Sequence, residues 1–261
     1  MTIVLNEHEW ARDMIESRSL GKKPFETLSR VAKYYLDNDY KKRDVRRMLD
    51  AFLIQCDPLA SLPKWSNTID CALERALKYD AIRVDFIEIT DPEIKTIDSL
   101  EGKQVRRLAF TLLCLAKYWD VVNPNGNHWV NSKDCDIMRM ANINTSIKRQ
   151  SLMYHILGDK GLIQFSKKVD NTNVRIKFIQ DGPTAVRIYD FRNLGYQYLM
   201  YHGEPYFECK NCGVTTKYDD PHNRNSVAKQ KYCRSCAAEI NIQKTVNSVM
   251  KKRENKNATS I

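Results

Sequence analysis

Four of the eight cysteines occur in two closely spaced pairs that could hold a metal ion. Cys209, Cys212, Cys233 and Cys236 follow the pattern C-x2-C-x20-C-x2-C. Four thiolates at these separations can close a tetrahedron around Zn²⁺, which leaves no coordination position open for a substrate. The spacing therefore predicts one Zn²⁺ ion with a structural role.

A pair of disulfides is the alternative for these cysteines. The other four, Cys56, Cys71, Cys114 and Cys135, are scattered through apolar or helical contexts. Unpartnered thiols are typical of a reducing compartment, and a thioredoxin-like context for a redox C-x2-C motif is absent. Zinc is the favoured interpretation. His222, between the two pairs, is expected to be a loop residue and not a ligand.

The neighbouring residues predict how the chain positions the four thiols. Gly213 suits a tight knuckle after the first pair, and the second pair opens a helix that continues to about Val249. Residues 208–250 resemble a treble-clef or zinc-ribbon finger, a family used for contacts with both nucleic acids and proteins. Lys229, Lys231 and Arg234 flank the second pair, and a basic tail follows.

A second set of candidate residues lies on an amphipathic helix expected within 146–157. At about 100° per residue, one narrow polar strip forms. Its members are Asn144, Lys148, Ser151 and His155, with Arg149 near the helix start. The apolar stripe, expected to face the core, contains Ile147, Met153, Tyr154 and Leu157, with Leu152 and Ile156 beside it.

A basic hairpin is expected directly after this helix, in residues 162–179. Ile163 and Phe165 alternate with polar residues on the way out, and the same alternation at Val174, Ile176 and Phe178 marks the return. The four cations of this hairpin are Lys167, Lys168, Arg175 and Lys177.

The order helix, short strand, helix, turn, helix and hairpin over residues 102–179 resembles the winged-helix family of DNA-binding domains. The resemblance implies that the third helix enters the major groove and that the hairpin, or wing, touches the DNA backbone. The implied DNA contacts are Asn144, Lys148, Arg149, Ser151, His155, Lys167, Lys168, Arg175 and Lys177. Any half-buried helix shows a polar strip, however, and winged-helix modules also serve as protein-docking units.

Charge is distributed unevenly along the 261 residues, whose formal net charge is +10. Residues 1–100 hold 16 Lys and Arg against 18 Asp and Glu, whereas residues 101–261 hold 26 against 14. The second part is therefore the one expected to meet a polyanion. No apolar run reaches the roughly 20 residues of a membrane helix and no signal peptide begins the chain, so a cytoplasmic, nucleoid-associated protein is expected.

The predicted fold is mainly α, of the α+β class. Its expected parts are a helical N-terminal domain (1–100), the winged helix (101–180), an aromatic-rich connector (181–207) and the zinc finger with its basic tail (208–261). In the connector, Phe191, Leu194, Tyr198 and Tyr201 recur at helical spacing, which predicts a core or docking surface. Stacking of these aromatics on single-stranded nucleic acid is the alternative.

The combination of a helical N-terminal domain, a winged helix and a zinc finger with a basic tail resembles small DNA-binding proteins of bacteriophages and mobile elements. This resemblance implies a role in replication initiation or transcriptional control. No sequence motif of a catalytic site is present. The first hypothesis is a non-enzymatic protein that binds double-stranded DNA, with N-terminal helices that form a homodimer or bind a protein partner. The alternative is an adaptor that docks on a host polymerase, helicase or defence complex. The third hypothesis is a nuclease whose fold includes a treble-clef finger.

Overall fold

The computed structural model describes residues 3–167 and 173–258. These ranges contain eleven helices and seven short strands, which confirms the predicted mainly helical, α+β class. The chain divides into two compact units, Met1–Ile87 and Glu88–Ile261. Helix α5, within the range 1–100 that was assigned to the N-terminal domain, therefore belongs to the second unit.

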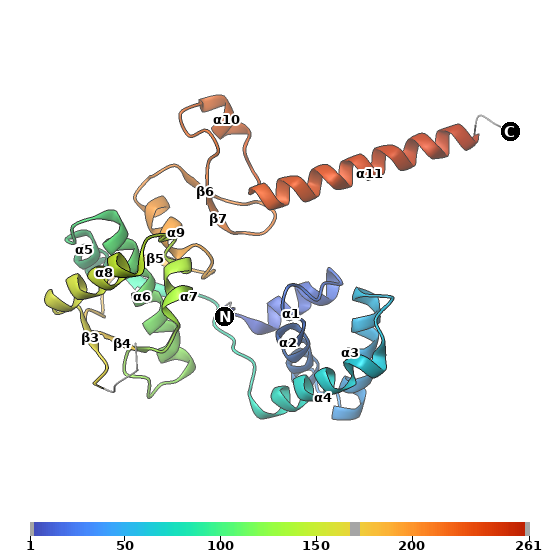
Figure 1. The fold of residues 1–261 in the computed structure, drawn as a ribbon, viewed down its shortest axis with the longest axis horizontal. Coiled ribbons are helices and arrows are strands. Elements are labelled where there is room, and N and C mark those ends of the chain that lie inside the picture. The colour runs from blue at the N-terminus through green and yellow to red at the C-terminus, as the bar shows by residue number, and fades with distance from the viewer. Residues whose placement is uncertain (1–2, 168–172, 259–261) are drawn as a thin grey trace. The chain divides into compact units, whose positions relative to one another are not determined.

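The first unit consists of four helices around one apolar core (Figure 1). They are α1 (Glu7–Glu16), α2 (Pro24–Asp37), α3 (Lys42–Cys56) and α4 (Leu62–Lys78). Pro24 occupies the first turn of α2, where its missing N–H costs nothing. The apolar residues that recur at helical spacing in α2 and α3 face this core; Leu28, Val31, Val45 and Leu49 are fully buried.

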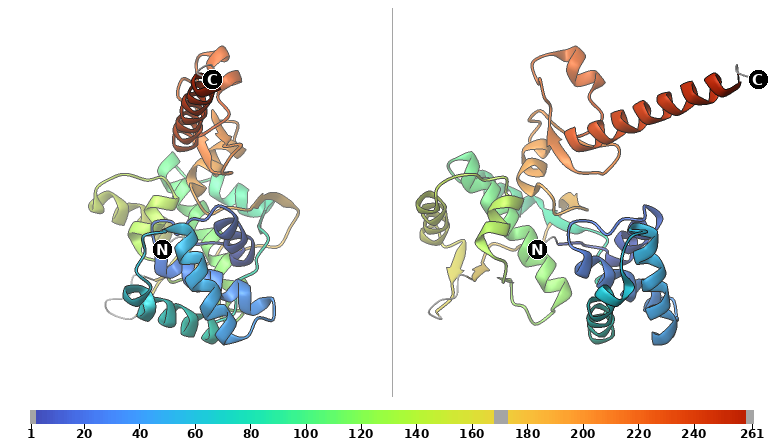
Figure 2. Two further views of the ribbon diagram at one scale, coloured as in Figure 1. Left: turned by 90° about the vertical axis from the view of Figure 1, so that its right-hand side faces the viewer. Right: turned by 45° about the vertical axis from the view of Figure 1, so that its right-hand side comes forward.

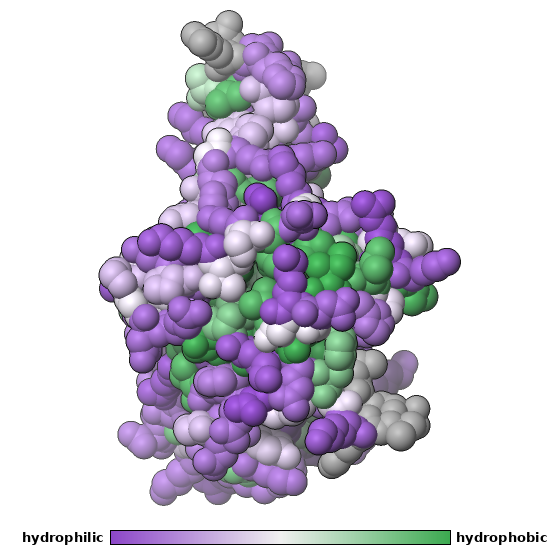
Figure 3. Space-filling model, turned by 90° about the vertical axis from the view of Figure 1, so that its left-hand side faces the viewer, coloured by the Kyte–Doolittle hydropathy of each residue, from purple (hydrophilic) through white to green (hydrophobic). Residues whose placement is uncertain are grey.

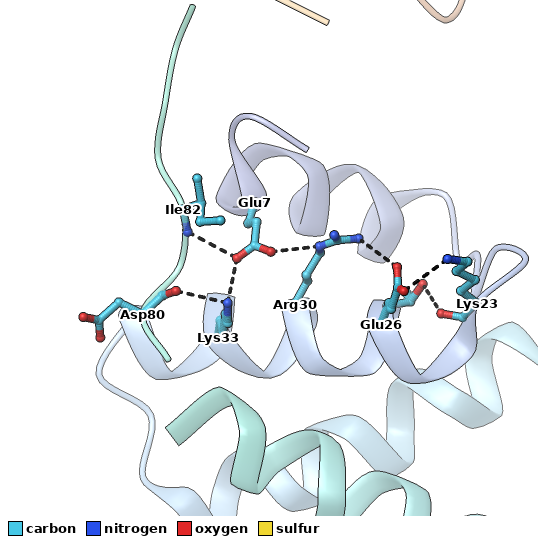
Figure 4. A network of polar contacts seen from close by, with 8 residues as sticks. Glu7, Lys23, Glu26, Arg30, Lys33, Asp80 and Ile82 are labelled. Atoms are coloured by element: carbon cyan, nitrogen blue, oxygen red, sulfur yellow. Dashed lines mark hydrogen bonds and ion pairs between the residues drawn. The ribbon is translucent and has the colours of Figure 1, made fainter. Parts of the chain in front are cut away.

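A buried ion network ties the end of this unit to its first two helices (Figure 4). The carboxylate of Glu7 accepts hydrogen bonds from Arg30 Nε at 3.0 Å, Lys33 Nζ at 2.8 Å and the Ile82 backbone N–H at 3.2 Å. Lys33 also donates to the Asp80 carbonyl at 3.0 Å. Because Glu7, Arg30 and Lys33 are all buried, the network fixes the segment after α4 against α1 and α2.

The second unit is built around the long helix α6 (Lys103–Val122). Eleven of its residues are buried, and it packs against α5, α7, α8, α9, β2 and β4. The elements before the finger, besides α6, are β1 (Ile87–Thr90), α5 (Asp91–Asp98), β2 (Trp129–Val130), α7 (Asp134–Met140), α8 (Ile147–Asp159), β3 (Ile163–Phe165), β4 (Val174–Ile176) and β5 (Thr184–Ile188). Thr90 and Glu93 form a capping box at the start of α5, where Thr90 and Pro92 predict a helix start.

A three-stranded antiparallel sheet lies against α6, with strand order β2-β4-β3. Its central strand pairs Val174 with Val130 on one side, and Ile176 with Ile163 on the other. All four of these side chains are buried, so this face of the sheet closes the core over α6. A separate two-stranded sheet joins β1 to β5.

The remaining elements of the second unit are α9 (Leu194–Tyr201), β6 (Tyr206–Glu208), β7 (Thr215–Lys217), α10 (Arg224–Lys229) and α11 (Arg234–Ala258). Phe191, Leu194 and Tyr198 of the connector are buried, as their helical spacing predicts, while Tyr201 is 42% exposed. Figure 2 shows α11 as one long helix without a kink. No helix in the described ranges is long and apolar enough to cross a membrane.

Candidate metal centre and candidate nucleic-acid interface

The structure brings all four predicted cysteine ligands together. The sulfur atoms of Cys209, Cys212, Cys233 and Cys236 lie within 4.8 Å of one another. Sulfurs at the corners of a tetrahedron with Zn–S bonds of about 2.3 Å are about 3.8 Å apart. The Sγ atoms of Cys212 and Cys233 are separated by 3.8 Å. The four cysteines are therefore close enough together to hold one metal ion.

Two short elements present the thiols. The antiparallel strands β6 and β7 hold Cys209 and Cys212 in the loop between them, and Gly213 adopts the left-handed, positive-φ conformation that the knuckle requires. The N-terminal turn of α11 carries Cys236, and Cys233 comes directly before this helix. This arrangement agrees with the predicted knuckle and helix. His222 is exposed and lies outside the cluster.

Backbone donors stabilise negative charge on the sulfur of Cys209. Burial alone raises the pKa of this thiol, but N–H groups of Cys233, Cys212 and Asn211 point at the sulfur and lower its pKa to about 6. The Cys233 N–H lies 3.2 Å from Sγ. Burial raises the pKa of the neighbouring Cys212, where hydrogen bonding with the other thiols acts in the same direction. Four sulfurs this close cannot all be thiolates unless a cation lies between them.

The polar strip predicted on α8 is exposed. Lys148, Ser151 and His155 all face solvent, and Asn144 is exposed in the turn before the helix. On the opposite side, Met153, Tyr154 and Leu157 are buried against the rest of the unit, as predicted. The tyrosine hydroxyl donates to Asp134 of α7 at 3.4 Å, which fixes the rotation of α8 about its axis.

Basic side chains of α8 and of the hairpin belong to the same predicted set of DNA contacts. Arg149 is exposed in the first turn of α8, and Lys167 and Lys177 are exposed on the hairpin. Arg175 is half-buried on β4 and donates from Nε to the Asn127 carbonyl at 3.0 Å. Within the ranges described, none of these four residues, nor Lys148, forms an ion pair with an acid. Lys168, also predicted to contact DNA, lies outside the described residues.

Two residues assigned to the apolar stripe of α8 are instead exposed. Ile147 is 84% exposed and Leu152 is 57% exposed, so the expectation that they pack inward is wrong. The tilt of α8 is set by Met153 and Leu157, which leaves both residues on the flanks of the polar strip. Phe165 is likewise 42% exposed, because its ring lies over Gly158 and beside His155 instead of entering the core. Figure 3 shows this side of the molecule, where apolar residues lie among hydrophilic ones.

Sequence reasoning missed a chain of asparagines that connects α8 to the metal centre. Asn142, in the turn between α7 and α8, donates to the Asn193 side chain at 2.9 Å and accepts from the Tyr196 N–H at 3.1 Å. Asn193 donates in turn to the Thr215 carbonyl on β7. Both asparagines have positive φ, which this residue type tolerates better than most. The available signal in the sequence was an Asn in the turn before α8 and another directly before α9.

A groove of about 710 Å³ lies beside the exposed strip, between α7 and the start of α8. Asn144, Ile147 and Gln150 line it from the α8 side, and Cys135 and Arg139 from α7. The groove is open to solvent, and its lining mixes apolar and polar groups. It is therefore a candidate contact surface and not an enclosed catalytic pocket.

Comparison of the chain with protein-family models, curated proteins and solved structures finds no match. The geometry of the metal centre, of α8 and of the hairpin therefore carries the functional conclusion.

Proposed function

We propose that this protein is a non-enzymatic DNA-binding protein that recognises double-stranded DNA with α8 and the hairpin β3–β4. The observation that carries the proposal is the exposed strip of Asn144, Lys148, Ser151 and His155 beside cations that have no acidic partner in the described chain. Side chains of these types can donate to base edges and phosphates.

The order of elements also supports the proposal. Helices α6, α7 and α8, with the sheet order β2-β4-β3, follow the sequence that resembles a winged helix. In that arrangement α8 would lie in the major groove, and β3 and β4 would form the wing. The first turn of α8, which carries Lys148 and Arg149, would then be closest to the bases.

The two units differ in how many of their basic side chains form ion pairs with acids. In the first unit, three of the five cations in residues 41–47 have acidic partners: Arg46 pairs with Asp50 and Asp70, Arg47 with Asp44, and Lys42 with Glu74. In the second unit, the cations of α8 and of the hairpin have no such partners among the described residues. A polyanion is the partner that would satisfy them.

Zn²⁺ is the metal that we assign to the four cysteines, because an all-thiolate tetrahedron suits it and the site keeps no open position for catalysis. Its role would be structural. Binding free energy on the order of 10 kcal/mol would stabilise a finger that is too small to build its own apolar core. Through Asn193 and Asn142, the finger would also support the turn before α8.

The biological setting is inferred from resemblance alone. Replication initiation or transcriptional control, in a phage or mobile element, fits a small duplex-binding protein of this composition. The first unit would then supply dimerisation or bind a protein partner, since several cations of α3 are already paired with acids.

Salt dependence of binding tests the proposal. Removal of one phosphate contact flattens the slope of log K against log salt by about 0.9 for duplex DNA. Replacing Lys167 and Lys177 of the wing by alanine should therefore reduce the slope by up to about 2. The matched control is the double alanine variant of Lys22 and Lys64, two exposed lysines of the first unit. Equal slopes for the wild type and the wing variant would remove the wing from the interface.

The adaptor function remains a second candidate, and the groove between α7 and α8 favours it. Under this hypothesis, a stoichiometric protein partner would be recovered from lysate treated with nuclease. Ile147→Asp, which places a charge on the rim of the groove, should abolish that recovery. Loss of every partner after nuclease treatment of the wild type would argue against the adaptor.

A further inference from the structure

The most exposed apolar side chain of α8 lies at its first residue. Ile147 is 84% exposed, although helical periodicity assigns it to the core stripe. On the helix surface it lies next to Ser151, one turn later, and it follows the exposed Asn144 of the preceding turn. An isoleucine therefore borders the residues proposed to meet base edges.

The position of Ile147 in the first turn of α8 indicates which kind of partner could cover this side chain. Recognition helices of the helix-turn-helix type contact base edges with their N-terminal residues. Ile147 belongs to the first turn of α8, as do Lys148 and Arg149. The only acid on α8, Asp159, is its last residue, at the opposite end of the helix. The surroundings of Ile147 on this helix are therefore cationic or neutral, which suits a negatively charged partner better than a basic protein surface.

Only one group on the major-groove edges of DNA is apolar, namely the C5 methyl group of thymine. The other edge groups are hydrogen-bond donors and acceptors. The side chain of isoleucine cannot form a hydrogen bond with any of them. A branched aliphatic side chain held at the groove floor would lose water from its own surface and from the methyl group at the same time.

We propose that Ile147 contacts a thymine methyl group in the major groove, so that the protein selects duplexes with thymine opposite the first turn of α8. This inference rests on the proposed DNA-binding function and adds a specificity determinant to it. Asn144, Lys148 and Ser151 would provide the polar contacts around this apolar one.

Replacement of thymine by uracil isolates the methyl group, because it removes that group and leaves every donor and acceptor of the base in place. The probes are 20-base-pair duplexes selected from a random-sequence pool by the wild-type protein, then synthesised again with deoxyuridine for thymidine. Burial of one methyl group corresponds to roughly a three- to five-fold change in affinity. The wild type should therefore bind the thymine form about three- to five-fold more tightly than the uracil form.

Ile147→Ala should bind both forms with the same affinity, because it lacks the side chain that detects the methyl group. The matched control is Leu59→Ala, which changes a 94% exposed leucine of the first unit and should keep the preference for thymine. Both positions are exposed, so neither change should disturb folding.

The outcomes separate the two proposals. Duplex binding without any thymine preference in the wild type would overturn the role of Ile147 and leave DNA binding intact. A thymine preference that persists in Ile147→Ala would assign the methyl contact to another residue, and would also overturn the inference. Failure of the wild type to select or bind any duplex would overturn the proposed function itself.

Discussion

Glu7 shows how this chain accommodates a charge inside its first unit. Desolvation opposes the ionised form, but hydrogen bonds from Lys33, Arg30 and the Ile82 backbone together outweigh it and lower the pKa of the carboxyl group. Three donors converge on one carboxylate, so the negative charge of Glu7 is compensated. Lys148 presents the opposite situation, a cation that the described chain leaves in solvent. We interpret the first as structural and the second as functional.

Glu7→Gln should destabilise the first unit by about 3 kcal/mol, because it removes the counter-charge of the buried Lys33 and leaves Arg30 with Glu26 alone. Urea unfolding of the full chain, followed by a signal from Trp10 or Trp65, measures this change. Glu74→Gln breaks the ion pair with Lys42, in which both side chains are more than half exposed. That control should cost at most about 0.5 kcal/mol. Equal effects of the two substitutions would contradict the structural role of the Glu7 network.

The same network predicts a pH dependence. Because the pKa of Glu7 is lower in the folded chain than its ordinary value of 4.5, the unfolded state binds more protons in this range. The stabilisation from Glu7 is therefore fully present above about pH 4.5 and is lost as the pH falls through the folded pKa. The difference in stability between wild type and Glu7→Gln should shrink between pH 6 and about pH 3. A difference that stays constant over this interval would show that the carboxylate charge is not involved.

At the scale of elements, the packing of α9 against the end of α7 allows no side chain at Gly195. A Cβ atom there would lie 2.0 Å from the carbonyl oxygen and 2.6 Å from the carbonyl carbon of Ala141. Both are backbone atoms, so no rotamer change can relieve the clash. This contact holds α9 beside Asn142, whose side chain caps the helix and leads to the turn before α8.

Gly195→Ala should destabilise the second unit by about 3 kcal/mol, because the two backbones must separate. Gly158→Ala is the matched control. Its Cβ would meet the ring of Phe165 at 2.9 Å, but this partly exposed side chain can move, and alanine favours the helix by up to about 1 kcal/mol. Thermal unfolding of both variants measures the difference. A Gly195→Ala protein as stable as Gly158→Ala would show that α9 is not packed as described.

Local patterns predicted the elements better than they predicted the pairing of distant segments. The two C-x2-C motifs predicted the cluster of four sulfurs, because each motif is short and the geometry of its knuckle is local. The pairing of β1 with β5 was not foreseen, because almost a hundred residues separate these strands and β5 has no strong alternation. The exposure of Ile147 was missed for a related reason. Helical periodicity groups residues that share a face, but only tertiary packing decides where that face ends.

For the whole molecule, the metal should matter to one part of the second unit and not to the first. The protein should contain one Zn²⁺ per chain, and Cys209→Ser or Cys236→Ser should reduce this content. Chelation should increase hydrogen exchange in residues 205–236 while α1 to α4 remain protected. Zinc analysis together with hydrogen exchange measures both effects. Full protection of residues 205–236 in the metal-free protein would contradict a stabilising role for the ion.

The two units also differ in charge, as the counts for residues 1–100 and 101–261 predict. What those counts could not show is that acids of the first unit pair with three cations of its basic run, whereas α8 and the hairpin keep exposed cations. Charge pairing depends on side chains from different helices, such as Arg46 of α3 and Asp70 of α4. The sequence therefore predicted which half carries the excess of positive charge, but not which of its cations are left without an acidic partner in the described chain.

The most direct test of the central claim, that α8 enters the major groove of duplex DNA, is methylation protection on a selected duplex with dimethyl sulfate. Guanine N7 lies in the major groove and adenine N3 in the minor groove, so the two signals report the two grooves separately. The saturated wild-type complex should protect guanine N7 at discrete positions, and Lys148→Glu should lose that protection. Unprotected guanines in the saturated complex, or protection restricted to adenine N3, would contradict the account.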